Sequence, residues 1–512
     1  MASFLWFSGY AISSLIVFVF VNVLRQFLPR RKSEPPLVFN CVPFVGNAVA
    51  YGQNPHRFLE DCRRKHGDIF TFVLFGRKMT CYLGCSGNDF ILNAKHSDCN
   101  AEDIYGPLTI PMFGTDVVYD CPNEKLMEQK RFIKFGLSQE ALKEHVSLIE
   151  REVLDYIKTT QSLKGRLGQL NVTPSMAELT IFTAARALQG AEVRSKLDRG
   201  MARLYHDLDL GFQPINFLLP WAPLPHNRRR DIAHVKIRKI FTDIIAERRK
   251  VELEGGEVEH DMIWNLMHST YKNGTPVPDK EIAHIMITLL MGGQHSSSAA
   301  SSWTLLELAA RPDIQEELYQ EQVRNLSESG NGYLRPLQYS DLDKMPLLQG
   351  VIKETLRVHP SILAILRKVT KPMPVPGTPY VVGTDKVLLA SPSITAMSEE
   401  YFPDAKKWKP HRWLSRSDND EQDTEIVDYG YGPINKGTKS PFIPFGAGRH
   451  RCIGEKASYV NLSVIIATLV RHFRFSTVDG SSIVPETDYT SMFATPKWPA
   501  IIRWERREEA AV

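Results

Sequence analysis

One cysteine lies in a glycine-rich segment, FIPFGAGRHRCIGEKAS (residues 442–458), that runs into an apolar helical pattern. Phe445, Gly448, Cys452 and Gly454 follow the spacing F-x-x-G-x-x-x-C-x-G, and Gly446 adds a further glycine after Phe445. We expect Cys452 at a helix N-terminus, where backbone N–H groups and the helix dipole lower the pKa of a thiol. A thiolate is an axial ligand for haem iron, and glycines let the main chain approach a flat ligand. A buried structural cysteine beside a turn is the alternative.

A second candidate site is the stretch GGQHSSS within a helical pattern over residues 279–311. The pattern predicts one helix of roughly 50 Å, at about 1.5 Å per residue. We expect an interruption at Gly292 and Gly293, because each glycine weakens a helix by about 1 kcal/mol and the serines that follow compete for backbone carbonyls. His295 and Ser296 are then polar groups in a local groove. Glycines for close helix packing, with serines as neutral fillers, are the alternative.

Two further motifs contain opposite charges. KETLR places Glu354 and Arg357 three residues apart on one helix face, and PHRW contributes Arg412. Alone, the E-x-x-R spacing is also typical of a solvated surface ion pair.

Composition limits the class of protein. The chain has 512 residues, 43% of them hydrophobic, and a net charge of +4, which is too small to indicate a nucleic-acid-binding protein. Seven cysteines without C-x-x-C spacing favour a reducing compartment over a disulfide framework or zinc knuckle. Long amphipathic patterns over 138–360, with alternating patterns in 51–100 and 364–400, predict a mainly α fold with a small β-rich lobe.

The N-terminus predicts a membrane anchor. Phe4 to Leu24 contains 21 residues without a charge, about 30 Å of helix. Basic residues follow this stretch, which indicates a retained single-pass transmembrane helix with the rest of the chain in the cytosol. A buried core helix is the alternative. We therefore expect an anchor with its basic stop at 1–34, a proline-rich hinge at 35–50 and a catalytic domain at 51–512.

The E-x-x-R motif, PHRW and the Cys452 loop occur in this order along the chain. Together they resemble the haem-thiolate signatures of the cytochrome P450 superfamily. The superfamily usually has arginine two residues before the cysteine, and this chain has His450 there. The resemblance implies haem b, O2, and electrons from NADPH through an NADPH–cytochrome P450 reductase. It also implies that Glu354, Arg357 and Arg412 form a structural network, and that His295 and Ser296 relay protons to bound dioxygen.

From about residue 35 to about residue 500, the chain resembles the fungal sterol 14α-demethylases, most closely the filamentous-fungal A-type form. Stretches such as MGGQHSSS, FGTDVVYDCPNEKLMEQKRF and YKNGTPVPDKEIAHIMI carry this resemblance. It implies removal of the 14α-methyl group of lanosterol or eburicol in three oxidations, with release of formate, in ergosterol biosynthesis. A monooxygenase of another steroid, fatty acid or xenobiotic, and a non-catalytic haem or sterol-binding membrane protein, are the alternatives.

Site residues follow from the same resemblance, matched position by position. The implied haem contacts, besides Cys452, are Tyr105, Tyr119, Lys130, Gly293, Arg367, Phe445, Gly446 and His450. The implied substrate contacts are the two tyrosines together with Phe113, Phe212, Leu366, Met492 and Phe493. For the tyrosines and the apolar residues, ordinary core packing is the alternative.

Three departures bear on substrate preference and on the response to azole inhibitors. Leu363 and Ala364 replace a usual His-Ser, and Ser458 replaces a usual aromatic residue. The choice between lanosterol and eburicol, the azole affinity and the oligomeric state stay open on the sequence.

Membrane lipid and the reductase are the other expected partners, with the protein on the endoplasmic reticulum membrane. The apolar segment 212–225, with Trp221 and a basic edge, indicates a patch that dips into lipid, with core burial as the alternative. Arg449, Arg451 and Lys456 offer positive charge for a reductase on the cysteine side.

Overall fold

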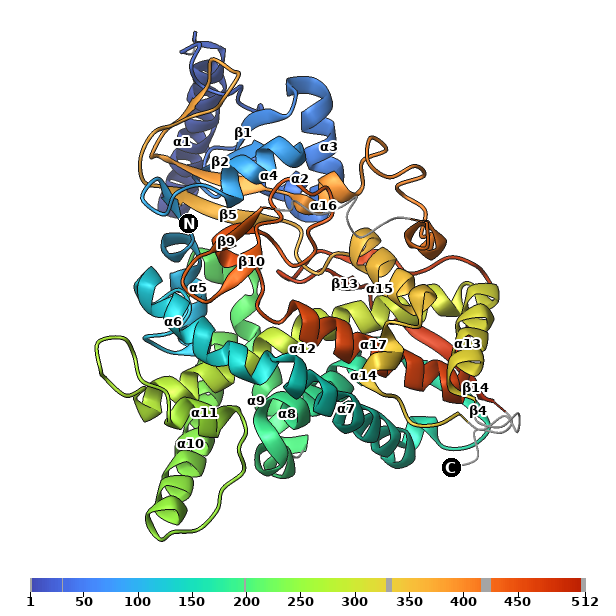
Figure 1. The fold of residues 1–512 in the computed structure, drawn as a ribbon. Coiled ribbons are helices and arrows are strands. Elements are labelled where there is room, and N and C mark those ends of the chain that lie inside the picture. Colours follow the sequence, from blue (N-terminus) through green and yellow to red (C-terminus); the bar gives the residue numbers. More distant parts are fainter. Residues whose placement is uncertain (1, 30, 198, 328–333, 416–424, 508–512) are drawn as a thin grey trace. The chain divides into compact units, whose positions relative to one another are not determined.

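The protein is described by a computed structural model covering residues 2–29, 31–197, 199–327, 334–415 and 425–507. Two compact units emerge (Figure 1). The first unit comprises residues 1–104, 363–401 and 437–450, and the second comprises 105–362, 402–436 and 451–512. The second unit is mostly helical and the first holds the largest sheet, so the expected mainly α fold with a small β-rich part is confirmed.

The first unit is built around a five-stranded sheet of order β1-β2-β8-β5-β3. A two-residue turn joins β1 to β2, and both of its residues, Phe75 (φ 47°) and Gly76 (φ 76°), have the left-handed backbone that such hairpin turns need. The strands of the first unit are β1 (Ile69–Leu74), β2 (Arg77–Tyr82), β3 (Cys99–Asn100), β5 (Ile365–Val369), β6 (Met373–Pro374), β7 (Val381–Val382) and β8 (Lys386–Ala390). Its helices are α1 (Ala2–Phe27), α2 (Ala48–Gln53), α3 (Pro55–His66), α4 (Gly84–Leu92) and α16 (Pro392–Ala396).

The N-terminal segment is tied to this unit by hydrogen bonds. Gln26 on α1 donates from Nε2 to the backbone O of Asn40 (2.7 Å), and Thr71 of β1 donates its N–H to Pro36 O (2.7 Å). Within the described part of the chain, no helix combines the length and apolarity that crossing a membrane requires. The transmembrane anchor at 1–34 therefore stays a prediction.

The second unit carries most of the helices. They are α5 (Glu102–Phe113), α6 (Asn123–Lys134), α7 (Gln139–Thr159), α8 (Val172–Lys196), α9 (Arg199–Asp209), α10 (Pro225–Leu253), α11 (Met262–Met267), α12 (Asp279–Ala309), α13 (Pro312–Leu326), α14 (Tyr339–Leu342), α15 (Pro346–Val358) and α17 (Glu455–His472). Its strands are β4 (Leu167–Asn171), β9 (Ile426–Asp428), β10 (Pro433–Asn435), β11 (Phe473–Thr477), β12 (Thr487–Asp488), β13 (Thr495–Pro496) and β14 (Ile501–Arg506).

Helix α12 is the central element of the second unit and packs against α8, α10, α15 and α17. Acidic Asp279 and Glu281 occupy its first turn, where they complement the helix dipole, and it ends shortly before Pro312. Most of its side chains are buried. A helix covered on all sides by others is stabilised mainly by tertiary packing rather than by the propensities of its residues.

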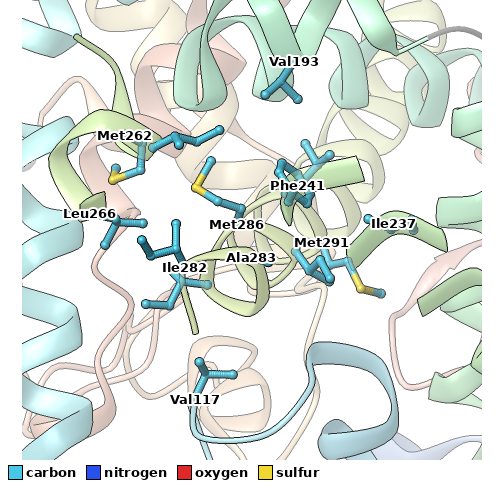
Figure 2. Packing of buried hydrophobic residues seen from close by; sticks show 14 of the residues in the cluster. Val117, Val193, Ile237, Phe241, Met262, Leu266, Ile282, Ala283, Met286 and Met291 are labelled. Carbon is cyan, nitrogen blue, oxygen red and sulfur yellow. The ribbon is translucent and has the colours of Figure 1, made fainter. Parts of the chain in front are cut away.

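A hydrophobic cluster surrounds the N-terminal half of α12. Figure 2 shows Ile282 and Met286 of α12 among Phe241 of α10, Met262 of α11 and other apolar side chains. Phe241, Ile282 and Met286 are fully buried. This packing fixes α12 against α10 and α11, and so fixes the polar residues that α12 carries.

Acid should destabilise the protein through His145 of α7, which is 7% exposed and whose pKa burial lowers to about 4. The imidazole is neutral in the folded state and charges readily when unfolded, at an ordinary pKa near 6.5. The free energy of unfolding is therefore unaffected by this group above pH 6.5. It decreases as the pH falls toward 4, by about 3 kcal/mol at the lower limit.

The measurement is the free energy of unfolding in urea at pH 7, 6, 5 and 4. His145→Gln should lose less stability than the wild type over this range, and His411→Gln, at an exposed position, should follow the wild type. Parallel pH dependences for His145→Gln and the wild type would contradict the expectation.

Candidate functional site

Cys452 lies two residues before Gly454, the N-cap residue of α17, as the sequence predicts. The backbone N–H of Gly454 hydrogen-bonds the thiol, and the side chain is accessible from outside the protein. Further back in the loop, a Cβ at Gly448 (φ +66°) would meet Leu92 O at 2.3 Å. Glycine is therefore required there, because the main chain of the loop passes directly against that of Leu92.

The expected lowering of the Cys452 pKa is wrong for the protein chain alone. Desolvation by the surrounding atoms raises the pKa of this thiol, and Glu455 adds to the effect, while the Gly454 N–H, Lys130 and Arg451 oppose it. The protein atoms around the sulfur outweigh the dipole of α17, although the side chain is accessible, because the sulfur lies ahead of the first helical turn. A coordinated metal ion deprotonates a thiol outright, so a metal centre reverses this balance.

Arg451 is not an unpaired surface cation. Its guanidinium forms an ion pair with Glu455 (2.7 Å) and donates to the backbone O of Asn435 (2.8 Å). Of the basic residues predicted to face a reductase, Lys456 is exposed in the second unit and Arg449 is half-buried in the first. The prediction that Arg451 adds docking charge needs this correction.

Four other predicted haem contacts lie in the second unit: Gly293 of α12, Tyr105, Tyr119 and Lys130. The rings of Tyr105 and Tyr119 stack with centroids 5.2 Å apart and planes inclined by 28°. Lys130 of α6 lies 3.4 Å from the backbone O of Arg451 and 4.8 Å from the ring centroid of Tyr431. Lys130 is near enough to the Cys452 thiol to lower its pKa electrostatically. The cation that the sequence predicts for a haem propionate therefore lies close to the cysteine.

Arg367, Leu366, Phe445, Gly446 and His450 belong to the first unit. Arg367 of β5 is 5% exposed and donates to the backbone O of Leu366 (2.8 Å). No ion pair to Arg367 occurs among the described residues. A guanidinium carries five donors and keeps its charge, so a buried one requires an anionic partner. An organic carboxylate such as a haem propionate would satisfy it.

Each unit by itself has groups that suit a haem. The second unit holds one accessible thiol, and the first holds a glycine backbone that excludes a Cβ and a buried cation, Arg367, without a carboxylate among the described residues. Among the described residues, no group of three His, Cys, Asp or Glu side chains could hold a metal ion. A single protein ligand is what a porphyrin iron needs, because the macrocycle supplies four nitrogens.

The predicted interruption of α12 is wrong, because the helix is continuous from Asp279 to Ala309. Ser296 Oγ donates to the backbone O of Gly292 (3.2 Å), which is one helical turn earlier. Gly292 is exposed, and a Cβ there would meet no atom within 4 Å, whereas Gly293 faces Leu188 and Ala184 of α8. Open space thus borders α12 at Gly292 without a break in the helix.

His295 contacts a residue that the sequence did not single out. Its Nε2 lies 2.7 Å from Oδ1 of Asp209, the last residue of α9. The imidazole stacks on Phe493 (4.8 Å, 16°) and meets Phe212 edge-on (5.5 Å). The pair is separated by 86 residues in the chain, so no local pattern could have indicated it.

The predicted substrate contacts of the second unit lie together. Phe212 contacts Phe493 (5.1 Å) and Phe113 (6.2 Å) through edge-on rings, and Met492 packs against the same hydrophobic cluster. These side chains form an aromatic wall beside the His295–Asp209 pair. The wall is apolar and has one polar pair, which suits a large apolar ligand with few polar groups.

Glu354 and Arg357 of α15 form a fully buried, bidentate ion pair (2.8 and 2.9 Å). Arg412, the backbone N–H of Lys409 and the indole of Trp413 also donate to Glu354, at 2.8 to 3.0 Å. The surface ion pair considered from the sequence is therefore excluded. The three residues form one network that binds the 405–413 segment to α15.

The departures from the family pattern occupy structural positions. In the first unit, the backbone O of Leu363 accepts hydrogen bonds from Ser391 and Ser393 (2.9 Å each), and Ala364 is half-buried beside it. Ser458 lies in the first turn of α17, where its N–H donates to Gly454 O.

The 212–225 segment is divided between interior and surface. Phe212 and Asn216 are buried, whereas Trp221 is 76% exposed and Ile215 and Leu219 are partly exposed. Neither uniform burial nor uniform exposure is correct for this segment.

Comparison with known proteins gives consistent matches over nearly the whole chain. Residues 35–504 match the family described as cytochrome P450. Sterol 14-alpha demethylase CYP51A of Gibberella zeae is 65% identical over 498 residues, with 97% of each chain covered. Sterol 14-alpha demethylase cyp51A of Aspergillus fumigatus is 58% identical, with 99% of each covered, and eburicol 14-alpha-demethylase of Penicillium italicum is 55% identical, with 97% of each covered.

A solved structure shares the fold. Retinoic acid bound cyanobacterial CYP120A1 superposes with a TM-score of 0.74 at 19% identity, with 93% of this chain and 100% of that chain covered.

Replacing Glu354 should be among the most damaging single changes. Glu354→Gln leaves the Arg357 guanidinium buried without a counter-charge, and should lower the free energy of unfolding by about 3–5 kcal/mol. Urea denaturation measures this loss, and the yield of folded protein reports it if the variant does not accumulate. As a control, Glu317→Gln breaks a half-exposed pair with His411 and should cost about 1 kcal/mol or less. Equal losses would contradict a network held by burial.

Proposed function

The chain belongs to the cytochrome P450 family, and on that premise we propose that it is a sterol 14α-demethylase. The reaction removes the 14α-methyl group of lanosterol or eburicol in three O2- and NADPH-dependent oxidations and releases formate. The contact of His295 with Asp209 inside an aromatic wall is the observation that carries this proposal, because it combines a proton relay with a large apolar surface. Relatives of 55–65% identity named for this activity support it.

Haem b, when bound, supplies the activation of dioxygen and the oxidation of the methyl group. Cys452 would hold the iron as its thiolate ligand, and by the family resemblance Arg367 and Lys130 would offer positive charge to the propionates, with His450, whose charge depends on pH, as a further partner. By the same resemblance, Tyr105 and Tyr119 would offer phenol donors to the propionates. The Gly454 N–H, which hydrogen-bonds the sulfur, stabilises its anionic form.

His295 and Asp209 move protons in this proposal. Asp209 accepts from or exchanges a proton with His295 Nε2 at 2.7 Å, and Asp209 is 20% exposed, so the pair communicates with solvent. Ser296, the next residue of α12, holds its hydroxyl against Gly292 O and can rotate toward the open space beside Gly292. Phe212 and Phe493 enclose the imidazole and limit water access to the relay.

The aromatic wall formed by Phe113, Phe212, Met492 and Phe493 binds the sterol rings by burying apolar surface, at about 25 cal/mol per Å². Azole inhibitors are expected to compete for this space. An apolar, largely rigid ligand loses little conformational entropy on binding such a wall.

The protein acts at the endoplasmic reticulum membrane in this proposal. Residues 1–34 are the anchor, and the exposed Trp221 with Ile215 and Leu219 forms a second apolar contact with lipid. Flotation with liposomes of a chain lacking residues 1–34 tests the second contact, since complete loss of binding would exclude it. Electrons come from NADPH through a separate reductase that meets exposed Lys456 on the cysteine side.

The test is reconstitution of the full-length, haem-loaded protein with a P450 reductase, NADPH and either lanosterol or eburicol. Mass analysis should find the 14-demethylated sterol and formate, and Cys452→Ser should abolish both the product and the thiolate-type carbon monoxide band. Turnover of another steroid or a fatty acid, with neither sterol demethylated, would replace the proposal with another monooxygenase. A haem-loaded protein without any NADPH-dependent turnover would indicate a carrier.

Asp209→Asn should slow sterol turnover by about 100-fold, because the amide cannot pass a proton to or from His295. Sterol affinity, read from the shift of the Soret band, should stay within about twofold, and the solvent isotope effect on turnover should increase. Asp207→Asn is the matched control, two residues earlier on α9, where the carboxylate pairs with Arg229 instead. An equal loss of turnover in both variants would contradict the relay.

A further inference from the structure

A small cavity of about 290 Å³ lies in the second unit, and none of the residues assigned to haem and sterol lines it, although Phe113 directly precedes Gly114 of its wall. Its walls come from the end of α5 and the turn after it, from α10 and from the first turns of α12. Four of the side chains that line it carry nitrogen or oxygen atoms that could contact a bound ligand: Asp231, His234, Arg238 and His284. The proposed function uses none of them.

His284 lines this cavity and has one unpartnered nitrogen. The residue is 1% exposed, and its Nδ1 lies 2.9 Å from the backbone O of Thr115. A carbonyl oxygen only accepts, so Nδ1 carries the proton and Nε2 carries a lone pair. Among the described residues, Nε2 has no hydrogen-bond partner. A buried lone pair without a partner is costly, and it indicates a ligand that the protein chain does not itself supply.

The ring of His284 is fixed in place as well as in tautomer. A Cβ at Gly114 (φ +95°) would meet ring atoms of His284 at 2.4 Å, so the imidazole packs directly on the glycine main chain. Figure 2 shows its neighbour Ala283 within the packed core beside Met286. The lone pair of Nε2 therefore has little freedom to turn away from the cavity.

His234 of α10 faces His284 across the cavity. The ring centroids lie 5.4 Å apart with planes inclined by 41°, and the buried Nε2 of His234 also has no partner among the described residues. Two imidazoles that share one tetrahedral zinc ion, with Zn–N bonds of about 2.1 Å, have centroids roughly 5 Å apart. The observed separation matches this spacing.

The surrounding charges are mixed. Arg238 lines the cavity and opposes a cation there, whereas Lys280 pairs with Asp116 (3.7 Å), and Asp231 adds a carboxylate that also pairs with Arg230 (2.8 Å). Burial lowers the pKa of both His234 and His284, so both imidazoles are neutral near pH 7, which is the form that binds metals.

We propose that His234 and His284 bind a divalent transition metal ion, for which Zn²⁺ is the probe, and so link α10 to α12. No three His, Cys, Asp or Glu side chains in the described ranges are grouped tightly enough to hold a metal alone, so water fills the remaining positions. The arrangement of His284, with its other ring nitrogen donating to a backbone carbonyl, is the usual second-shell support of a metal-binding histidine. This proposal does not depend on the sterol substrate.

The experiment uses the haem-loaded full chain, stripped with EDTA and titrated with ZnCl2 in equilibrium dialysis. His226→Gln is the matched control, because His226 is also on α10 with an unpartnered Nε2 but does not line the cavity. The wild type and His226→Gln should bind one Zn²⁺ with equal affinity. His234→Gln should weaken that binding at least tenfold, and Zn²⁺ should raise the unfolding midpoint of the first two proteins only.

X-ray absorption at the zinc edge adds a readout that does not depend on a variant folding. It should find two imidazole nitrogens at about 2.0–2.1 Å, with oxygen in the other positions. Zn²⁺ affinity unchanged in His234→Gln, or a zinc spectrum without two imidazoles, would overturn the proposal. A loss of sterol turnover with zinc binding intact would overturn only the proposed function.

Discussion

The unbroken hydrogen-bond ladder of α12 governs where the chemistry of the second unit can occur. A helix turns by about 100° per residue, so His284 and His295, eleven positions apart, lie on nearly the same face and about 16 Å apart along the axis. The apolar side chains of the surrounding helices hold this face in register. Because the ladder does not break at Gly292, the two histidines are parts of one rigid element.

Desolvation has different consequences at Cys452 and at Arg367. The Cys452 side chain is accessible, yet the protein atoms around its sulfur favour the neutral thiol, and a metal centre is needed to stabilise the anion. At Arg367, the charge cannot be neutralised by proton loss, so the buried guanidinium retains a need for an anion. A cofactor with a central cation supplies what Cys452 needs in the second unit, and an organic carboxylate supplies what Arg367 needs in the first.

Much of the site could be predicted from local spacing. The Cys452 loop, the Glu354–Arg357 pair and the helix after Gly454 depend on residues close in sequence, so their patterns determine them. The continuity of α12 could not be predicted, because packing against α8 and α10 outweighs the weak propensities of Gly292 and the serines.

Contacts between distant residues were beyond sequence reasoning for a different reason. Asp209 and His295 meet only because α9 ends beside α12, and His234 faces His284 only because α10 packs along it. The sign of the Cys452 pKa shift was also missed, since desolvation depends on every atom that surrounds the sulfur. Composition and periodicity do not indicate which distant residues become neighbours in the fold.

The network at Glu354 has an implication for how this part of the chain can diverge. Arg357 reaches the main-chain oxygens of Ala405 (2.7 Å) and Lys407 (3.2 Å), so the side chains at those two positions take no part. Another side chain at the exposed Lys407 would leave this acceptor in place, a larger one at the fully buried Ala405 would not fit, and gain or loss of one residue would shift both acceptors out of reach. We therefore expect natural variants to conserve the length of this segment more strictly than the identity of its exposed residues.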